Sequence, residues 1–131
     1  ARRTSNGSLC QLFFQKMINS KKKGTAFERE VVNDIKEAGL DKYARRSIMS
    51  GAVFEPGDLK TKLPFYIECK HQKRFQVYKY WRQIREEISK NIGTRKRPLV
   101  VAKEDYQDKL AIIEWFDFLE ILDYAFKGGY K

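Results

Sequence analysis

The sequence predicts a single α/β domain, because segments with helical apolar spacing alternate with short apolar runs typical of strands. The chain has 131 residues, enough for one core of about three to five strands and a few helices. The helices are expected at residues 25–38, 77–91 and 115–126. The strands are expected at residues 43–47, 65–70, 98–102 and 110–113.

The composition is strongly basic and points to a polyanionic partner. Lysine and arginine number 27 against 17 aspartates and glutamates, and the formal net charge is +10. Such a charge favours nucleic acid over a membrane surface. No apolar run approaches the roughly 20 residues that span a bilayer, and residues 9–18 lack the cleavage pattern of a secretory signal. We therefore expect an intracellular protein without a membrane partner.

The cysteines and the histidine exclude several kinds of site. Cys10 and Cys69 lie far apart in the chain, so they form neither a disulfide framework nor a set of zinc ligands. His71 is the single histidine and cannot anchor a histidine-based metal site. A Ser-His-Asp or Cys-His arrangement through His71 stays open, although a lone histidine after a strand more often faces solvent or substrate.

The N-terminal residues are expected to lie outside the main core. Residues 1–8 are polar and predict a flexible arm, and residues 9–18 have the spacing of a short amphipathic helix. A run with three lysines and a glycine, residues 19–24, predicts a break after this helix. We therefore assign residues 1–22 to a flexible basic arm with a short helix, and residues 23–131 to the folded domain.

The segment from Thr25 to Ala38 predicts the first long helix, with Thr25 as its N-cap and Gly39 after its end. At 100° per residue one apolar stripe forms, and Glu28 falls near its middle while Glu30 points away. The stripe consists of Phe27, Val31, Val32, Ile35 and Ala38. Because an ionised carboxylate aimed at a core is costly unless it is paired or bound to metal, Glu28 is a functional candidate. The alternatives are a partner for a buried arginine or a stripe edge that reaches water.

A central motif follows the strand at residues 43–47. It consists of Gly57-Asp58-Leu59-Lys60, a turn, and Phe65-Tyr66-Ile67-Glu68-Cys69-Lys70. Along a strand Glu68 and Lys70 share one face, whereas Phe65, Ile67 and Cys69 share the other. If the segment with Asp58 pairs antiparallel with this strand, two carboxylates and an ammonium converge. The alternative is a surface hairpin whose charges face solvent.

This group of side chains suits hydrolysis of a phosphodiester. The oxygens of Asp58 and Glu68 could hold Mg²⁺, which usually binds one or two carboxylates together with water and substrate phosphate. Lys70 could orient the attacking water or balance charge on the phosphoryl oxygens.

Further residues are candidates for contact with phosphate. Arg45 and Arg46 point to opposite faces of their strand, so one of them can face the site, and the loop at Ser50 can offer a hydroxyl group. The basic residues after the central motif and the loop at residues 94–97 can follow a phosphate backbone.

The C-terminal half supplies the remaining elements. In the helix at residues 77–91 the apolar spacing predicts that Trp81 packs in the core. Residues 98–102 and 110–113 read as buried strands separated by a charged turn. The helix at residues 115–126 has apolar residues on more than one face, so part of it could form a dimer contact.

Taken together and in this order, four of these segments resemble the PD-(D/E)XK nuclease superfamily, and within it the archaeal and phage-type Holliday junction resolvases. The segments are Lys23 to Glu30, Arg46 to Gly51, Gly57-Asp58, and Ile67 to Lys70. They cover about residues 23–103. Two features depart from the family pattern: Gly57 stands where the superfamily's name has proline, and the basic arm before Lys23 is long.

The resemblance implies an α/β, restriction-endonuclease-like core with a central mixed β-sheet flanked by α-helices. It also implies dependence on Mg²⁺, with Mn²⁺ as a substitute, and a homodimer that makes paired symmetric nicks in four-way DNA junctions. The nuclease domain would be residues 23–131, acting in the cytoplasm of a prokaryote or of a phage-infected host.

The resemblance also implies roles for individual residues. Asp58 and Glu68 would bind the metal, Glu28 would be a further or water-mediated ligand, and Lys70 would be the catalytic base or orient the water. The residues expected to contact the substrate are Ser50, Arg46, Lys23, Lys73, Arg74, Arg95 and Arg97.

Three alternatives to a junction resolvase remain on the sequence alone. One is another nuclease of the superfamily, restriction-like or active in repair or replication, that acts on duplex, flap or single-stranded DNA. A second is a non-catalytic DNA-binding module, which would not need all four of Glu28, Asp58, Glu68 and Lys70. A third is a basic RNA-binding domain, which gives no reason for an acid within the apolar stripe of a helix.

Overall fold

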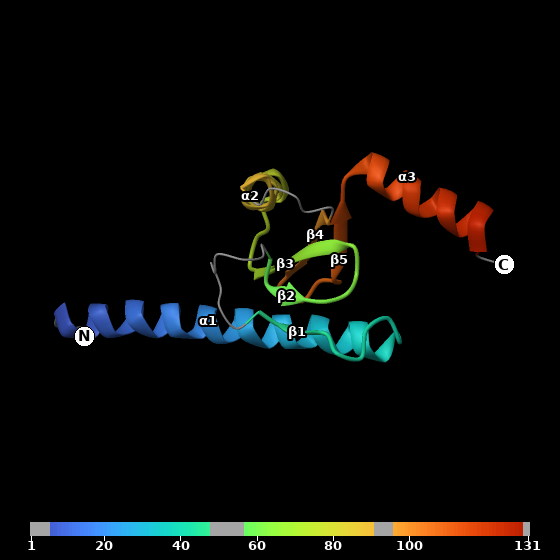
Figure 1. Cartoon of the computed structure of the whole chain (residues 1–131). Helices are drawn as coiled ribbons and strands as arrows, with labels where there is room; N and C mark the ends of the chain where they lie inside the picture. The colour runs from blue at the N-terminus through green and yellow to red at the C-terminus, as the bar shows by residue number, and fades with distance from the viewer. Residues whose placement is uncertain (1–5, 48–56, 91–95, 130–131) are drawn as a thin grey trace.

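The computed structural model describes residues 6–47, 57–90 and 96–129, with side chains from residue 20 onward (Figure 1). The chain begins with a long helix, then alternates short strands with helices. The elements are α1 (Asn6–Glu37), β1 (Arg45–Arg46), β2 (Leu59–Lys60), β3 (Phe65–Gln72), α2 (Val77–Ser89), β4 (Arg97–Glu104), β5 (Leu110–Ile113), α3 (Trp115–Asp123) and the π-helix η1 (Tyr124–Gly129).

The central sheet is mixed. β3 pairs with β4 in parallel, from Phe65 opposite Arg97 to Gln72 opposite Glu104. β4 then pairs with β5 in an antiparallel ladder, so β3 lies at the edge of this sheet. The two short strands β1 and β2 form a separate antiparallel pair.

Helices α1 and α2 lie on opposite sides of the central sheet (Figure 1). Side chains of β3 therefore alternate between two cores, because successive residues of a strand point to opposite faces. The core beneath α1 contains Phe27, Val31, Val32, Ile35, Ala44, Leu59, Ile67 and Cys69. The core beneath α2 contains Tyr66, Ile84, Val100 and Ala102, with Trp81 packed against it. The predicted α/β architecture and the alternation along residues 65–70 are both confirmed.

Two predictions about α1 are wrong. The helix runs without interruption from Asn6 to Glu37, so residues 19–24 do not break it and Thr25 is no N-cap. The reason is that lysine is a good helix former, and one glycine in a helix costs only about 1 kcal/mol relative to alanine. Residues 6–22, predicted as part of a flexible arm with a short helix, thus continue the helix that packs on the sheet.

The predicted antiparallel pairing of the Asp58 segment with residues 65–70 is also wrong, because the two segments form no β-ladder with each other. β2 pairs with β1, whereas β3 takes β4 as its parallel partner. β3 is buried on both faces, which is typical of a strand in a parallel arrangement. The later strands agree with the sequence: β5 has the predicted bounds, and β4 is longer than predicted.

Helix α3 extends away from the sheet (Figure 1). None of its side chains is buried, and its exposed apolar residues include Trp115, Phe116 and Ile121. Its first turn is capped by the Glu114 side chain, which accepts a hydrogen bond from the Asp117 N–H at 2.9 Å. In the part of the chain that the structure describes, no helix combines the length and apolarity needed to cross a membrane.

A buried carboxylate joins the end of α1 to the turn after β2. Asp41 is 5% exposed; its Oδ1 accepts a hydrogen bond from the Tyr43 N–H at 2.9 Å and its Oδ2 one from the Lys62 N–H at 2.8 Å. The hydrogen bonds from the Lys62 and Tyr43 backbone lower the pKa of Asp41 below its ordinary value of 3.8. Both carboxylate oxygens are thus used to fix backbone N–H groups.

We expect Asp41→Asn to lower the melting temperature by several degrees at pH 7, because asparagine offers one acceptor oxygen where two are needed. The lowered pKa makes ionised Asp41 stabilising above pH 3.8, and this contribution is lost as the pH falls through the folded-state pKa. The difference from the wild type should therefore shrink towards acid. Thermal melts followed by circular dichroism would measure it, with Asp108→Asn, in an exposed position, as control. A difference that widens towards acid would contradict this account.

Candidate active site

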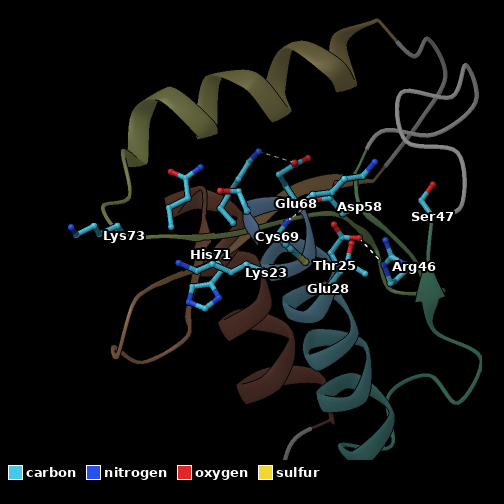
Figure 2. Close-up of a pocket in the computed structure, with 15 residues that line it drawn as sticks. Lys23, Thr25, Glu28, Arg46, Ser47, Asp58, Glu68, Cys69, His71 and Lys73 are labelled. Carbon is cyan, nitrogen blue, oxygen red and sulfur yellow. Dashed lines mark hydrogen bonds and ion pairs between the residues drawn. The ribbon is translucent and has the colours of Figure 1, made fainter. Parts of the chain in front are cut away.

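A pocket of about 780 Å³ opens where α1, the end of β1 and the edge strand β3 meet (Figure 2). Helix α1 contributes Ser20, Lys21, Lys23, Gly24, Thr25 and Glu28 to its lining. Strand β3 and the residue after it contribute Glu68, Cys69, Lys70, His71, Gln72 and Lys73. Arg46, Ser47 and Asp58 complete the wall. The pocket thus brings together segments that lie far apart in the sequence.

Asp58 is fixed to the edge of β3 that does not pair with β4. Its N–H donates to the Ile67 carbonyl at 2.7 Å, and its Oδ2 accepts from the Cys69 N–H at 2.8 Å. Its own carbonyl accepts from the Ser47 N–H at 2.8 Å. Asp58 therefore takes the place that a neighbouring strand would occupy. The carboxylate lies beside β3 even though the predicted ladder is absent.

Gly57 permits this close approach. Its φ is +97°, and a Cβ at this position would lie 2.9 Å from the Ile67 carbonyl oxygen and 3.1 Å from the Ile67 nitrogen. Proline has a fixed φ near −65° and could not adopt this conformation. The glycine that departs from the superfamily's name is therefore required by the backbone here.

Glu68 lies beside Asp58 and is almost completely buried, with 6% of its surface exposed. Burial is the main cause that raises the pKa of Glu68 well above that of a free glutamate, and the negative charge of Asp58 raises it further. The Lys70 ammonium acts in the opposite direction; its Nζ lies 3.5 Å from Glu68 Oε1. As the alternation along the strand predicted, Glu68 and Lys70 share a face of β3.

Glu28 projects from α1 towards the same pocket and meets Arg46 from β1 (Figure 2). Arg46 Nε donates to Glu28 Oε1 at 2.9 Å. Burial raises the pKa of Glu28, which the hydrogen bond from Arg46 partly offsets. Two expectations are therefore realised together: Glu28 lies in the pocket, and it pairs with an arginine, although the Arg46 side chain is 34% exposed rather than buried.

The donor set fits a hard divalent cation held by two carboxylates. Within the described residues no three His, Cys, Asp or Glu side chains are grouped so as to hold a metal ion, and Glu28 is engaged with Arg46. Asp58 and Glu68 also have partners, the Cys69 N–H and the Lys70 ammonium, so these contacts do not exclude Glu28 as a further ligand. Asp58 and Glu68 are the two carboxylates that interact directly with each other. Two adjacent carboxylates, one of them buried, repel each other, and a cation between them would relieve this repulsion. Mg²⁺ is commonly bound in this way, with water and substrate phosphate as its other ligands.

The candidate phosphate contacts fall into three groups. Arg46, Lys23 and Lys73 line the pocket, whereas Arg74 is exposed and does not line it. Arg97 lies at the other end of the parallel ladder, where its guanidinium pairs with Asp117 and Glu120 of α3. Ser50 and Arg95 lie outside the described residues.

Sequence reasoning missed two lining residues, Gln72 and Thr25, and left the role of a third, His71, open. His71 Nε2 lies 3.2 Å from Asp105 Oδ1, and Lys23 pairs with the same oxygen. The alternation along β3 could have identified Gln72, which continues the face of Glu68 and Lys70. Burial raises the pKa of the Cys69 thiol, so a Cys-His mechanism is not favoured.

A mixed sheet between helices, with an aspartate at the edge of a strand that carries Glu68-x-Lys70, defines a nuclease of the PD-(D/E)XK superfamily with the restriction-endonuclease-like fold. Residues 19–125 match the model of a family described as phage putative PDDEXK endonuclease, and the chain belongs to this family. No curated protein and no solved structure matches the chain.

We expect Gly57→Ala to be more destabilising than Gly39→Ala. Both glycines have positive φ, which costs another residue about 1–2 kcal/mol, but only at Gly57 would the new Cβ meet backbone atoms; nothing lies within 4 Å at Gly39. The clash should add about 1–3 kcal/mol to the loss. Denaturant unfolding of the two variants would measure the difference, and equal losses would show that the edge of β3 tolerates a Cβ.

Proposed function

We propose that the chain is a metal-dependent DNA endonuclease that hydrolyses phosphodiesters. More specifically, we propose that it is a Holliday junction resolvase. The observation that carries the proposal is the meeting of Asp58, Glu68 and Lys70 at one edge of β3 in a basic pocket. The proposed place of action is the cytoplasm of a phage-infected host; in support, the family is described as a phage endonuclease family.

Mg²⁺ is the proposed cofactor, with Mn²⁺ as a substitute, and Asp58 and Glu68 are the residues that would hold it. When bound, such an ion supplies a Lewis acid for the phosphoryl oxygen and lowers the pKa of a coordinated water. Lys70 lies next to Glu68, so its ammonium can orient the attacking water and stabilise negative charge on the phosphoryl oxygens. Glu28 holds Arg46 at the pocket wall, where the guanidinium can meet a phosphate.

DNA is the proposed substrate because the pocket is richer in cationic than in acidic residues. Five basic side chains line it, Lys21, Lys23, Arg46, Lys70 and Lys73, against three acidic ones. Lysine and arginine bind the phosphate backbone without reading the base sequence. Recognition through the shape of the DNA, rather than through its sequence, follows from such contacts.

The junction form of the proposal also requires two active sites in one assembly. Paired symmetric nicks need a homodimer, since each chain has one such pocket among its described residues. The exposed apolar side chains of α3 and η1 favour an interface there. A monomer would instead favour a nuclease that acts on duplex, flap or single-stranded DNA.

We expect the wild type with Mg²⁺ to place paired symmetric nicks in an immobile four-way junction and to leave a matched linear duplex intact. Glu68→Gln and Lys70→Ala should each reduce cleavage by at least about a hundredfold, while junction binding is retained. Lys42→Ala, an exposed lysine outside the pocket, is the matched control and should cleave as the wild type does.

Denaturing gels and gel-shift titrations would read out both activities. Cleavage of the duplex or of free ends would reject the resolvase and keep the nuclease. Binding without cleavage by the wild type would reject both in favour of a non-catalytic module.

Metal binding gives a second expected result that does not depend on cleavage. In EDTA at pH 7, Glu68→Gln should melt no lower than the wild type, because burial and Asp58 raise the pKa of Glu68 to about 8 and glutamine resembles the neutral carboxyl that this favours. Excess Mg²⁺ or Mn²⁺ should raise the melting temperature of the wild type, because a metal concentration of a hundred times Kd adds about 2.7 kcal/mol to the free energy of unfolding. The same excess should have little effect on Glu68→Gln. Calorimetric titration with Mn²⁺ would check the difference; equal binding by both proteins would reject Glu68 as a ligand.

A further inference from the structure

Lys70 is held from a second side by an aromatic ring of α2. Its Nζ lies 4.7 Å from the centroid of the Tyr80 ring, while Glu68 Oε1 lies 3.5 Å away. An ammonium over an aromatic face is attracted by the negative face of the ring. The charged end of Lys70 is therefore fixed between a carboxylate on its own strand and a ring on the helix that covers this face of the sheet.

The Tyr80 ring is itself anchored in two ways. Its hydroxyl donates a hydrogen bond to Gln72 Oε1 at 2.8 Å, and its ring stacks on Phe75 with centroids 5.3 Å apart and planes 13° from parallel. Phe75 is in turn fixed by its N–H, which donates to Glu104 Oε2 at 2.8 Å. Gln72 is the last residue of β3, so these contacts tie the ring to the strand that carries Lys70.

This anchoring matters because a lysine side chain is flexible and its ammonium has no fixed direction. The ammonium contacts Glu68 of β3 and Tyr80 of α2, so its position depends on how the helix packs on the sheet. Catalytic groups displaced by about 1 Å can lose about a hundredfold in rate. A fixed ring beneath the ammonium would prevent such displacement.

We propose that Tyr80 is the positioning residue of Lys70: its ring, anchored by Gln72 and Phe75, holds the ammonium at the pocket edge in the orientation needed for hydrolysis. The proposal rests on the nuclease function proposed above. The competing explanation is that Tyr80 only packs α2 against the sheet, in which case its loss would affect stability and not Lys70 in particular.

The test compares Tyr80→Leu, which removes the ring, with Tyr80→Phe, which keeps the ring and loses the hydroxyl. Under single-turnover conditions with Mg²⁺, Tyr80→Leu should cleave about tenfold to a hundredfold more slowly with unchanged affinity for DNA. Tyr80→Phe should keep most of the wild-type rate. Lys79→Ala is the matched control, because the Lys79 ammonium lies 5.5 Å from the same ring and does not line the pocket.

A double-mutant cycle separates positioning from packing. In the Lys70→Ala background, Tyr80→Leu should cause no further loss of rate, because the ammonium that it positions is absent. The same fold loss in both backgrounds would overturn the proposal. An equal loss in Tyr80→Phe and Tyr80→Leu would also overturn it, since the ring would then contribute nothing.

A measurement without metal or DNA distinguishes failure of this inference from failure of the nuclease function. The ε-methylene protons of Lys70, assigned in a proton–carbon spectrum by comparison with Lys70→Arg, should be shifted upfield by the Tyr80 ring. The shift should persist in Tyr80→Phe and disappear in Tyr80→Leu, while the rest of the spectrum keeps the dispersion of a folded protein. Unshifted Lys70 signals in the wild type would reject the proposal even if the protein cleaves DNA.

Discussion

The hydrogen bonds between Asp58 and the free edge of β3 are the constraint on which the rest of the site depends. They satisfy the Ile67 carbonyl and the Cys69 N–H, which would otherwise lack a partner strand on that side. They also place the Asp58 carboxylate beside Glu68, the residue that lies between Ile67 and Cys69 in β3. Gly57 makes this approach feasible, since any Cβ would press on the Ile67 peptide. A single turn therefore terminates the sheet and assembles two carboxylates.

The charges of the pocket are balanced in pairs that a substrate or a cation can change. Glu28 is matched by Arg46 and Glu68 by Lys70, yet burial and the nearby Asp58 still raise the pKa of Glu68. An arrangement that is costly in the absence of a ligand is common where a protein must bind one. Tyr80 adds a neutral contact to this set, because an aromatic face attracts the Lys70 ammonium without placing a further negative charge beside Asp58 and Glu68.

Much of this arrangement could be predicted from local patterns. The alternation of residues 65–70 correctly separates Ile67 and Cys69 from Glu68 and Lys70, because a strand has a period of two whatever its partner is. Helical spacing likewise identifies Glu28 among core residues. The break at residues 19–24 and the antiparallel ladder were predicted wrongly. Lysine favours a helix and a single glycine only weakens it, so this run did not end α1. The choice of a strand's partner depends on segments distant in sequence, here residues 97–104.

The sequence by itself determined the class of fold, the faces of β3 and α1, and the set of acidic and basic residues available for chemistry, since these follow from periodicity and composition. Only the tertiary structure decided which of these residues meet. It places Arg46 against Glu28, removes Arg97 to the far end of the ladder, where it pairs with α3, and brings Tyr80 beneath Lys70. The reason is that such contacts depend on how α1 and α2 pack on the two faces of the sheet, and packing joins residues whose separation in the chain carries no signal of their proximity.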